Sequence, residues 1–195
     1  MMTAAQTAYF RLLGSLLYNE PSAGTIHMLK NDGIFAELPF AADNTTAAEG
    51  KKLMSAWLDG APADKLTDEA RSDFMRLFIG PGKVLAAPWG SVYMSVDKLI
   101  FTEETLRVRK YYEANGRIVK EKNREPDDHI GLELEFIADL LDSDNFNMAC
   151  EFAEKLVLPW ILDWNSDVQK YAKTGYYQGL ANMAAGGVQA LTGKE

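Results

Sequence analysis

The sequence predicts an all-α protein: a single compact helical domain of about nine to ten helices over residues 1–195. Apolar residues recur at the three- and four-residue spacing of amphipathic helices along almost the whole chain. No stretch alternates polar and apolar residues for long enough to build a sheet, and no internal repeat is present. The length of 195 residues suffices for one domain with a sizeable hydrophobic core.

The N-terminal segment is the first expected helix, because its apolar side chains form one stripe with helical spacing. That stripe comprises Tyr9, Leu12, Leu13, Leu16 and Leu17. The run Asn19-Glu20-Pro21 ends the helix, since proline cannot continue it. A second, short helix is expected over residues 22–31, and Asp32-Gly33 ends it.

Two further helices are expected before the middle of the chain. Thr46 and Glu49 have the spacing of a capping box, so a helix should begin there and end at Gly60. Its apolar side chains are Leu53, Met54, Trp57 and Leu58. The run Thr67-Asp68-Glu69 predicts the start of the next helix, whose apolar stripe comprises Phe74, Leu77 and Phe78.

A long apolar loop follows, because the helical pattern fails in the sequence FIGPGKVLAAPWG. Three glycines and two prolines lie between Gly80 and Gly90. Most of the other residues in this loop are apolar, which is unusual for a loop on a free surface. The loop therefore either packs against the core or lines a binding site.

Helical patterns cover the rest of the chain apart from a polar connector. One helix begins at the run Thr102-Glu103-Glu104 and ends at Asn115-Gly116. Three more are expected over about 128–143, 146–171 with a break at Pro159, and 175–191.

Composition favours a cytoplasmic protein. Cys150 is the only cysteine, so no intrachain disulfide can form, and this suits a reducing compartment. The N-terminal segment lacks the charged region and the uninterrupted apolar stretch of a signal peptide. No run reaches the ~20 apolar residues that a membrane-spanning helix needs.

The charge distribution favours a basic partner and argues against nucleic acid. The net charge is −8, whereas binding to phosphates requires lysine and arginine. Residues 106–124 hold seven basic and two acidic side chains, and residues 125–154 hold ten acidic side chains with no lysine or arginine. A solvated helix face is the alternative explanation of such an acidic run.

The sign of the charge changes at the sequence EPDDHIGLELEF, which reads as a helix entrance. Pro126 disfavours a helical conformation at Glu125. Asp127 or Asp128 is therefore expected to cap the helix, because an aspartate side chain accepts a hydrogen bond from an orphan backbone N–H.

His129 and Glu133 lie four residues apart, so they are expected to be neighbours at the margin of the apolar stripe. Gly131 lies on the other flank and lets another group approach the backbone closely. A metal site lacks further ligands, since the only other histidine is His27. A small hydrolase-type enzyme could use His129 with Asp128 or Glu133 as its acid–base pair, although no nucleophile motif accompanies them. The rim of a peptide site and a plain helix cap with a satisfied histidine also remain open.

Two motifs resemble those of a known family. EPDDHIGLELEF is similar to the E-P-x-D-H-x-G signature of the TorD/DmsD family of redox-enzyme maturation chaperones. FIGPGKVLAAPWGSVY resembles the second landmark of that family, in which G-P is followed by P-W-G-S-V as in its DmsD-like members. The opening LLGSLLYNEP also resembles the first helix of the family, and the resemblance covers most of the chain.

This resemblance implies an all-helical cytoplasmic chaperone rather than an enzyme. Such proteins bind the twin-arginine signal peptide of a molybdenum-cofactor reductase of the dimethyl sulfoxide or trimethylamine N-oxide type. They hold the apo-form of the precursor until its cofactor is inserted, and then release it to the Tat translocase. The matching positions are Pro88, Trp89, Gly90, Ser91, Glu125, Pro126, Asp128, His129 and Gly131.

The resemblance leaves other properties open. Gly82 stands where DmsD-like proteins have a tryptophan after G-P, so the apolar part of the pocket and the choice of client are expected to differ. Some family members bind guanine nucleotides, but neither a P-loop nor an N-K-x-D pattern supports GTP binding here, and no cofactor is expected. Family members occur as monomers or as domain-swapped dimers, and the sequence favours neither.

The chemistry of a twin-arginine peptide agrees with these positions. Two guanidinium groups prefer carboxylates in bidentate geometry, and an apolar stretch prefers a groove. Asp127 and Glu133 add carboxylates beside Glu125 and Asp128, and Trp89 is the expected apolar anchor. The sequence thus predicts one peptide-binding region formed by the two motifs.

Overall fold

The computed structural model describes residues 4–35, 38–81, 84–117 and 124–194, and in these ranges it holds helices and isolated bridges but no strand. The all-α prediction is therefore confirmed. The helices are α1 (Ala4–Tyr18), α2 (Ala23–Asn31), α3 (Thr45–Asp59), α4 (Ala63–Phe74), α5 (Gly90–Met94), α6 (Glu103–Ala114), α7 (Ile130–Asp142), α8 (Phe146–Phe152), α9 (Leu158–Tyr171) and α10 (Gly175–Thr192). Single π-helical turns, Met75–Ile79 and Ala153–Val157, continue α4 and join α8 to α9.

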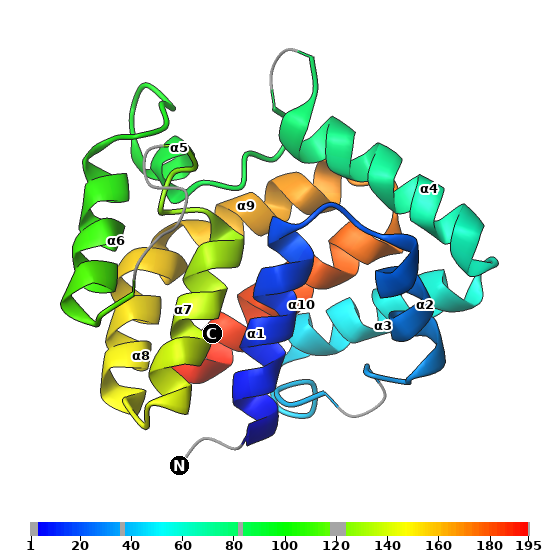
Figure 1. Cartoon of the computed structure of the whole chain (residues 1–195), viewed down its shortest axis with the longest axis horizontal. Helices are drawn as coiled ribbons and strands as arrows, with labels where there is room; N and C mark the ends of the chain where they lie inside the picture. Colours follow the sequence, from blue (N-terminus) through cyan, green and yellow to red (C-terminus); the bar gives the residue numbers. More distant parts are fainter. Residues whose placement is uncertain (1–3, 36–37, 82–83, 118–123, 195) are drawn as a thin grey trace.

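Two closely packed helix pairs organise the fold: α1 with α7, and α3 with α10 (Figure 1). Glycines at both crossings allow the backbones to touch. A Cβ atom on Gly131 of α7 would lie 2.8 Å from the carbonyl oxygen of Gly14 in α1. A Cβ atom on Gly179 of α10 would lie 2.8 Å from the carbonyl oxygen of Gly50 in α3. Larger side chains at these positions would push the helices apart.

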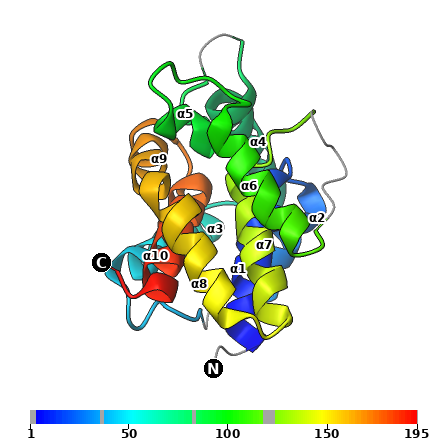
Figure 2. The same cartoon turned by 90° about the vertical axis from the view of Figure 1, so that its left-hand side faces the viewer.

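One hydrophobic cluster connects the helices from Tyr9 in α1 to Leu191 in α10. Its largest fully buried side chains include Trp160, Trp164, Tyr112, Phe136 and Phe152. Helices α6 and α8 flank α7 at one end of the molecule, and α2, α3 and α4 lie at the other (Figures 1 and 2). Within the described residues, no helix is both long and apolar enough to cross a membrane.

Two helix starts differ from the prediction. Helix α3 begins at Thr45 and is capped by Asn44, whose Oδ1 accepts a hydrogen bond from the Ala47 N–H at 2.9 Å. Thr46 is therefore inside the helix, because an asparagine two residues earlier already supplies the cap. Helix α4 begins at Ala63, four residues before Thr67, whose hydroxyl group donates to the Ala63 carbonyl group.

The predicted break at Pro159 is a change of helix type. The chain remains helical from Phe146 to Tyr171, and the π-helical turn Ala153–Val157 immediately precedes α9. Proline has no N–H to donate and clashes with the carbonyl group four residues earlier in a regular α-helix. The wider π turn accommodates Pro159 in the first turn of α9 without ending the helix.

Candidate functional site

The two sequence motifs meet at the N-terminal end of α7. The Ile130 N–H donates to the Pro88 carbonyl oxygen at 2.8 Å, and the Gly90 N–H donates to the Asp128 carbonyl oxygen at 3.0 Å. Trp89 and His129 consequently form an isolated antiparallel β-bridge. The apolar loop packs against the core along Ala86, Ala87 and Pro88, which are buried. The loop and the signature therefore form one structural unit.

The buried Asp128 side chain links the turn before α7 to α5 and α6. Its Oδ2 accepts a hydrogen bond from the Ser91 N–H at 2.6 Å, at the start of α5. Its Oδ1 accepts a hydrogen bond from the Thr105 hydroxyl group of α6, also at 2.6 Å. The prediction that Asp127 or Asp128 caps α7 is wrong, because both carboxylates turn away from the helix end toward α5 and α6.

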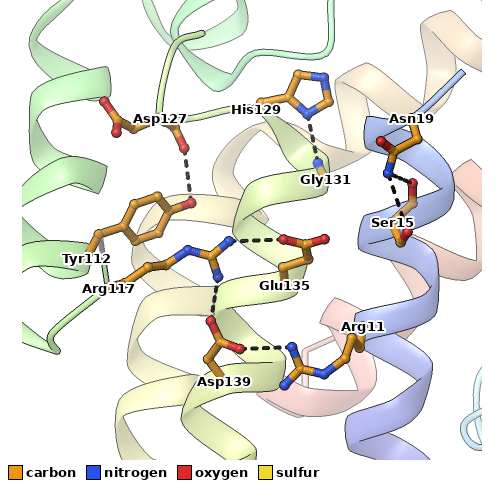
Figure 3. A network of polar contacts seen from close by, with 10 residues as sticks. All are labelled: Arg11, Ser15, Asn19, Tyr112, Arg117, Asp127, His129, Gly131, Glu135 and Asp139. Carbon is orange, nitrogen blue, oxygen red and sulfur yellow. Dashed lines mark hydrogen bonds and ion pairs between the residues drawn. The ribbon is translucent and has the colours of Figure 1, made fainter. Parts of the chain in front are cut away.

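His129 is the residue that caps α7. Its Nδ1 accepts a hydrogen bond from the Gly131 N–H at 3.0 Å, as Figure 3 shows. This contact requires a neutral ring, and burial lowers the pKa of His129 to about 3. The ring packs edge-on against Tyr18 and Trp89. His129 therefore organises the helix entrance as a neutral group.

Asp127 forms an internal ion pair. The Arg109 Nε of α6 donates to Asp127 Oδ2 at 2.7 Å, and Arg109 Nη2 lies 2.5 Å from the same oxygen atom. The Tyr112 hydroxyl group donates to the Asp127 carbonyl oxygen at 3.0 Å (Figure 3). The Asp127 side chain is completely buried. Its negative charge is thus directed to α6 and away from solvent.

Glu133 lies inside the protein, whereas the sequence placed it at the margin of the apolar stripe. Its exposed fraction is 0%, and neither carboxylate oxygen makes a hydrogen bond of standard geometry among the described residues. Burial, and next the nearby charge of Asp128, raise the pKa of Glu133 well above its usual value. The Trp160 side chain lies close enough to lower the pKa of Glu133, but this effect is smaller than that of burial. Burial therefore favours the protonated, neutral form of Glu133.

Glu125 is the one carboxylate among the predicted site residues that reaches the surface. It is half-buried, and its Oε1 accepts a hydrogen bond from the Trp89 indole N–H at 2.6 Å. Burial raises the pKa of Glu125, and the Trp89 hydrogen bond opposes that shift. Pro126 and Ser91 are buried, and Gly131 contacts α1, as its predicted role of close approach requires. Gly82 lies outside the described residues.

Ion pairs cover much of the acidic outer face of α7. Arg117 donates to Glu135 Oε2 at 3.1 Å and to Asp139 Oδ2 at 2.7 Å, and Arg11 of α1 donates to Asp139 Oδ1 at 2.9 Å (Figure 3). Arg11 also pairs with Asp142. The acidic run in the sequence is therefore partly neutralised by arginines from other parts of the chain.

The geometry of His129 and Glu133 does not suit acid–base catalysis. No cluster of three or more metal-ligating side chains occurs among the described residues. His129 uses Nδ1 in the helix cap and resists protonation, so it is a poor general base. Glu133 is enclosed, which separates it from any substrate in solvent.

The sequence interpretation missed an exposed apolar segment between α5 and α6. Its exposed side chains are Met94, Val96, Leu99, Ile100 and Phe101, and Leu106 in α6 adds another. Val96 is 98% exposed and Leu99 is 59% exposed. The available signal was an apolar run, VDKLIF, just before the helix start at Thr102 and outside any helical stripe.

Comparisons with known proteins identify relatives along most of the chain. The sequence model of the nitrate reductase delta subunit family matches residues 41–164. The Tat proofreading chaperone DmsD of Salmonella typhimurium is 28% identical over 178 residues, which cover 89% of this chain and 82% of the relative. The chaperone protein TorD of Vibrio vulnificus is 25% identical over 120 residues, 56% of each chain. A crystal structure described as a redox enzyme maturation protein from Archaeoglobus fulgidus shares the fold, with a TM-score of 0.55 and 19% identity over 95% of this chain and 94% of that chain.

Proposed function

The chain belongs to the nitrate reductase delta subunit family, and we propose that it is a cytoplasmic Tat proofreading chaperone. Its relatives DmsD and TorD are named as chaperones, not as enzymes. In this proposal residues 1–195 form one chaperone domain that binds the twin-arginine signal peptide of a molybdoenzyme precursor. The client is a reductase of the dimethyl sulfoxide or trimethylamine N-oxide type, held as apo-protein until cofactor insertion and then passed to the Tat translocase.

The junction of the two motifs is the observation that carries this proposal. The backbone pairing of Pro88–Gly90 with Asp128–Ile130 brings Trp89 and Glu125 into direct contact at the surface. An aromatic side chain beside a carboxylate suits a peptide that has arginines next to an apolar stretch. Trp89 is partly exposed, so its ring has surface left for such a contact.

Glu125 is the proposed partner of a peptide arginine. A carboxylate has about four acceptor sites, and the Trp89 indole N–H occupies one of them. A guanidinium group can use the remaining sites in a bidentate arrangement, which the point charge of a lysine cannot reproduce. Asp127, Asp128, His129 and Glu133, all buried, then support the site from beneath instead of contacting the peptide.

Titration calorimetry with two synthetic peptides tests this function. The first peptide is a twin-arginine signal sequence from a molybdoreductase, and the second has both arginines replaced by lysines. We expect micromolar or tighter binding of the first peptide and weaker binding of the second at equal salt. Lysine keeps the positive charge of arginine but lacks the planar guanidinium group that forms two parallel hydrogen bonds.

Two protein variants sharpen the same experiment. Trp89→Ala should weaken binding of the twin-arginine peptide, and Leu162→Ser, at an exposed apolar position on α9, should not. Failure of the unaltered protein to bind signal peptides from a panel of molybdoreductases would refute the proposed function.

A further inference from the structure

An apolar surface lies next to the proposed site. Between α5 and α6 the chain forms the loop drawn in green beyond the label α5 in Figures 1 and 2. Met94, Val96, Leu99, Ile100 and Phe101 are exposed along this 94–101 segment. Leu106, in the first turns of α6, is half exposed as well. Several exposed apolar side chains gathered on one short segment are typical of interaction sites in soluble proteins.

The 94–101 segment is held at both ends by the signature. Asp128 accepts one hydrogen bond from the Ser91 N–H, before the segment, and one from the Thr105 hydroxyl group, after it. Within the segment, Ser95 Oγ accepts a hydrogen bond from the Leu99 N–H at 3.1 Å. A single buried carboxylate therefore links both flanks of the segment to the signature.

The backbone of the segment adopts a conformation that is rare for residues other than glycine. Lys98 has φ = 52° and Phe101 has φ = 58°, both in the left-handed region. Non-glycine residues in this region are uncommon, and such conformations gather at ligand-binding and switch segments. The exposed apolar side chains thus belong to a defined backbone turn.

The size and charge of this surface suit a peptide. Six side chains at these exposures present at most on the order of 600 Å², because even an aromatic side chain buries only about 150–250 Å². That area falls short of the ~800 Å² per partner of a standard protein–protein interface. Asp97 and Lys98 cancel each other in charge, and Arg107 pairs with Glu104, which leaves Glu103 and a formal charge of −1 over residues 94–107. The surface is thus weakly charged and favours an apolar occupant.

The position of the apolar surface next to the proposed site indicates which molecule binds to it. Helix α5 starts at Gly90, directly after Trp89, and ends at Met94, where the apolar surface begins. Resting on the function proposed above, we propose that the 94–101 segment and Leu106 bind the apolar stretch that follows the arginines of the same signal peptide. Glu125 and Trp89 bind the arginine end, and α5 leads from one half of the site to the other.

A comparison of two peptides and three proteins tests this proposal. One peptide is the twin-arginine signal sequence, and the other keeps the arginines but has a serine–glycine stretch of equal length in place of the apolar one. The proteins are the unaltered full chain, the double variant Val96→Ser/Leu99→Ser, and Leu162→Ser as a control at a position that is 44% exposed. Far-UV circular dichroism and urea unfolding establish that all three are equally folded.

We expect the double variant to bind the complete peptide about tenfold more weakly than the unaltered chain, since two apolar contacts are lost. Its affinity for the serine–glycine peptide should equal that of the unaltered chain, and Leu162→Ser should change neither affinity. Equal affinity of the double variant and the unaltered chain for the complete peptide would overturn this proposal while leaving the proposed function intact. Failure of the unaltered chain to bind the complete peptide would overturn both.

Self-association is the competing use of the surface. Sedimentation velocity over a range of protein concentrations should give the same monomer mass for the unaltered chain and the double variant. A dimer of the unaltered chain that disappears in Val96→Ser/Leu99→Ser would assign the surface to a second copy of the chain and would overturn the proposal.

Discussion

Replacement of Asp128 by alanine tests whether one buried carboxylate connects the Trp89 loop, α5 and α6. The substitution removes two hydrogen bonds of 2.6 Å and leaves the Ser91 N–H and the Thr105 hydroxyl group without their acceptor. A hydrogen bond to a charged group contributes about 1.5–3 kcal/mol, and the unpaired donors add to the loss. Because the two bonds share one residue and are not additive, we expect the free energy of unfolding to fall by about 3–5 kcal/mol.

Asp128→Asn is the matched control. The asparagine oxygen can still accept from the Ser91 N–H, and its amide group can donate to the Thr105 hydroxyl group, which accepts as well as donates. The expected loss is therefore smaller, about 1–2 kcal/mol.

Urea unfolding of the three proteins, followed by tryptophan fluorescence, measures both losses. Amide hydrogen exchange at Ser91 provides a local readout, since this N–H should exchange faster in Asp128→Ala than in the unaltered chain. A loss of less than about 1 kcal/mol of unfolding free energy in Asp128→Ala, or unchanged protection of the Ser91 N–H, would refute the proposed link between α5 and α6 through Asp128.

Three further predictions concern packing, protonation and binding. Gly131→Ala should destabilise the protein by about 1–3 kcal/mol in urea unfolding, because the new Cβ meets the α1 backbone. Gly24→Ala should not, because its Cβ would lie 3.8 Å from Ser22 Oγ, an ordinary contact distance; equal effects would contradict the close crossing. Glu133→Gln should raise the free energy of unfolding at about pH 7.5 and leave it unchanged at about pH 3.5. Burial raises the folded-state pKa of Glu133, so the folded chain keeps a proton that the unfolded chain loses above roughly pH 4.3. The free energy of unfolding of the unaltered chain therefore declines as the pH rises. An equal effect of Glu133→Gln at both pH values would exclude a raised pKa of Glu133. Glu125→Gln should weaken binding of the twin-arginine peptide about tenfold in calorimetry without lowering the urea midpoint, because glutamine still accepts from Trp89 but lacks the charge; unaltered affinity would remove Glu125 from the site.

Helix positions were predictable where apolar spacing and stop signals agreed. The stripe of α1, the proline after it, and the acidic start and Asn-Gly end of α6 are local features, and the structure confirms both helices. The association of the Trp89 loop with the signature was predicted from the family resemblance, and the backbone pairing of the two motifs confirms it.

The identity of the α7 cap depends on contacts that local sequence does not contain. Asp127, Asp128 and His129 are consecutive; the two aspartates are preferred capping residues, and histidine is not among them. The pairing of Pro88 and Gly90 with this turn, together with donors from Ser91 and Arg109, draws both aspartates away and leaves His129 at the helix end. These partners lie far from the turn in sequence, so a local rule selected the wrong residue.

The burial of Glu133 and the exposure of Val96 have a related cause. A helical projection assumes one buried face, but α7 packs against α1 and α8 and also lies beneath the Trp89 loop, so a residue at the margin of one stripe becomes interior. Conversely, an apolar side chain such as Val96 is expected inside, and only the course of the chain between α5 and α6 exposes it.

The two glycine-lined helix pairs also constrain how the chain acquires its structure. Helix α3 lies between α1 and α7 in sequence, yet its partner α10 follows α7, so the two pairs interleave and neither is enclosed within the other. During synthesis α1 and α3 emerge long before their partners, so their apolar faces stay exposed until α7 and α10 have been made. Contacts of such long sequence separation slow folding. The chain between α1 and α7 contains α3, and the chain between α3 and α10 contains α7. Loss of the contacts within either pair therefore frees a segment that holds one helix of the other pair. Unfolding should consequently occur as one cooperative event rather than helix pair by helix pair.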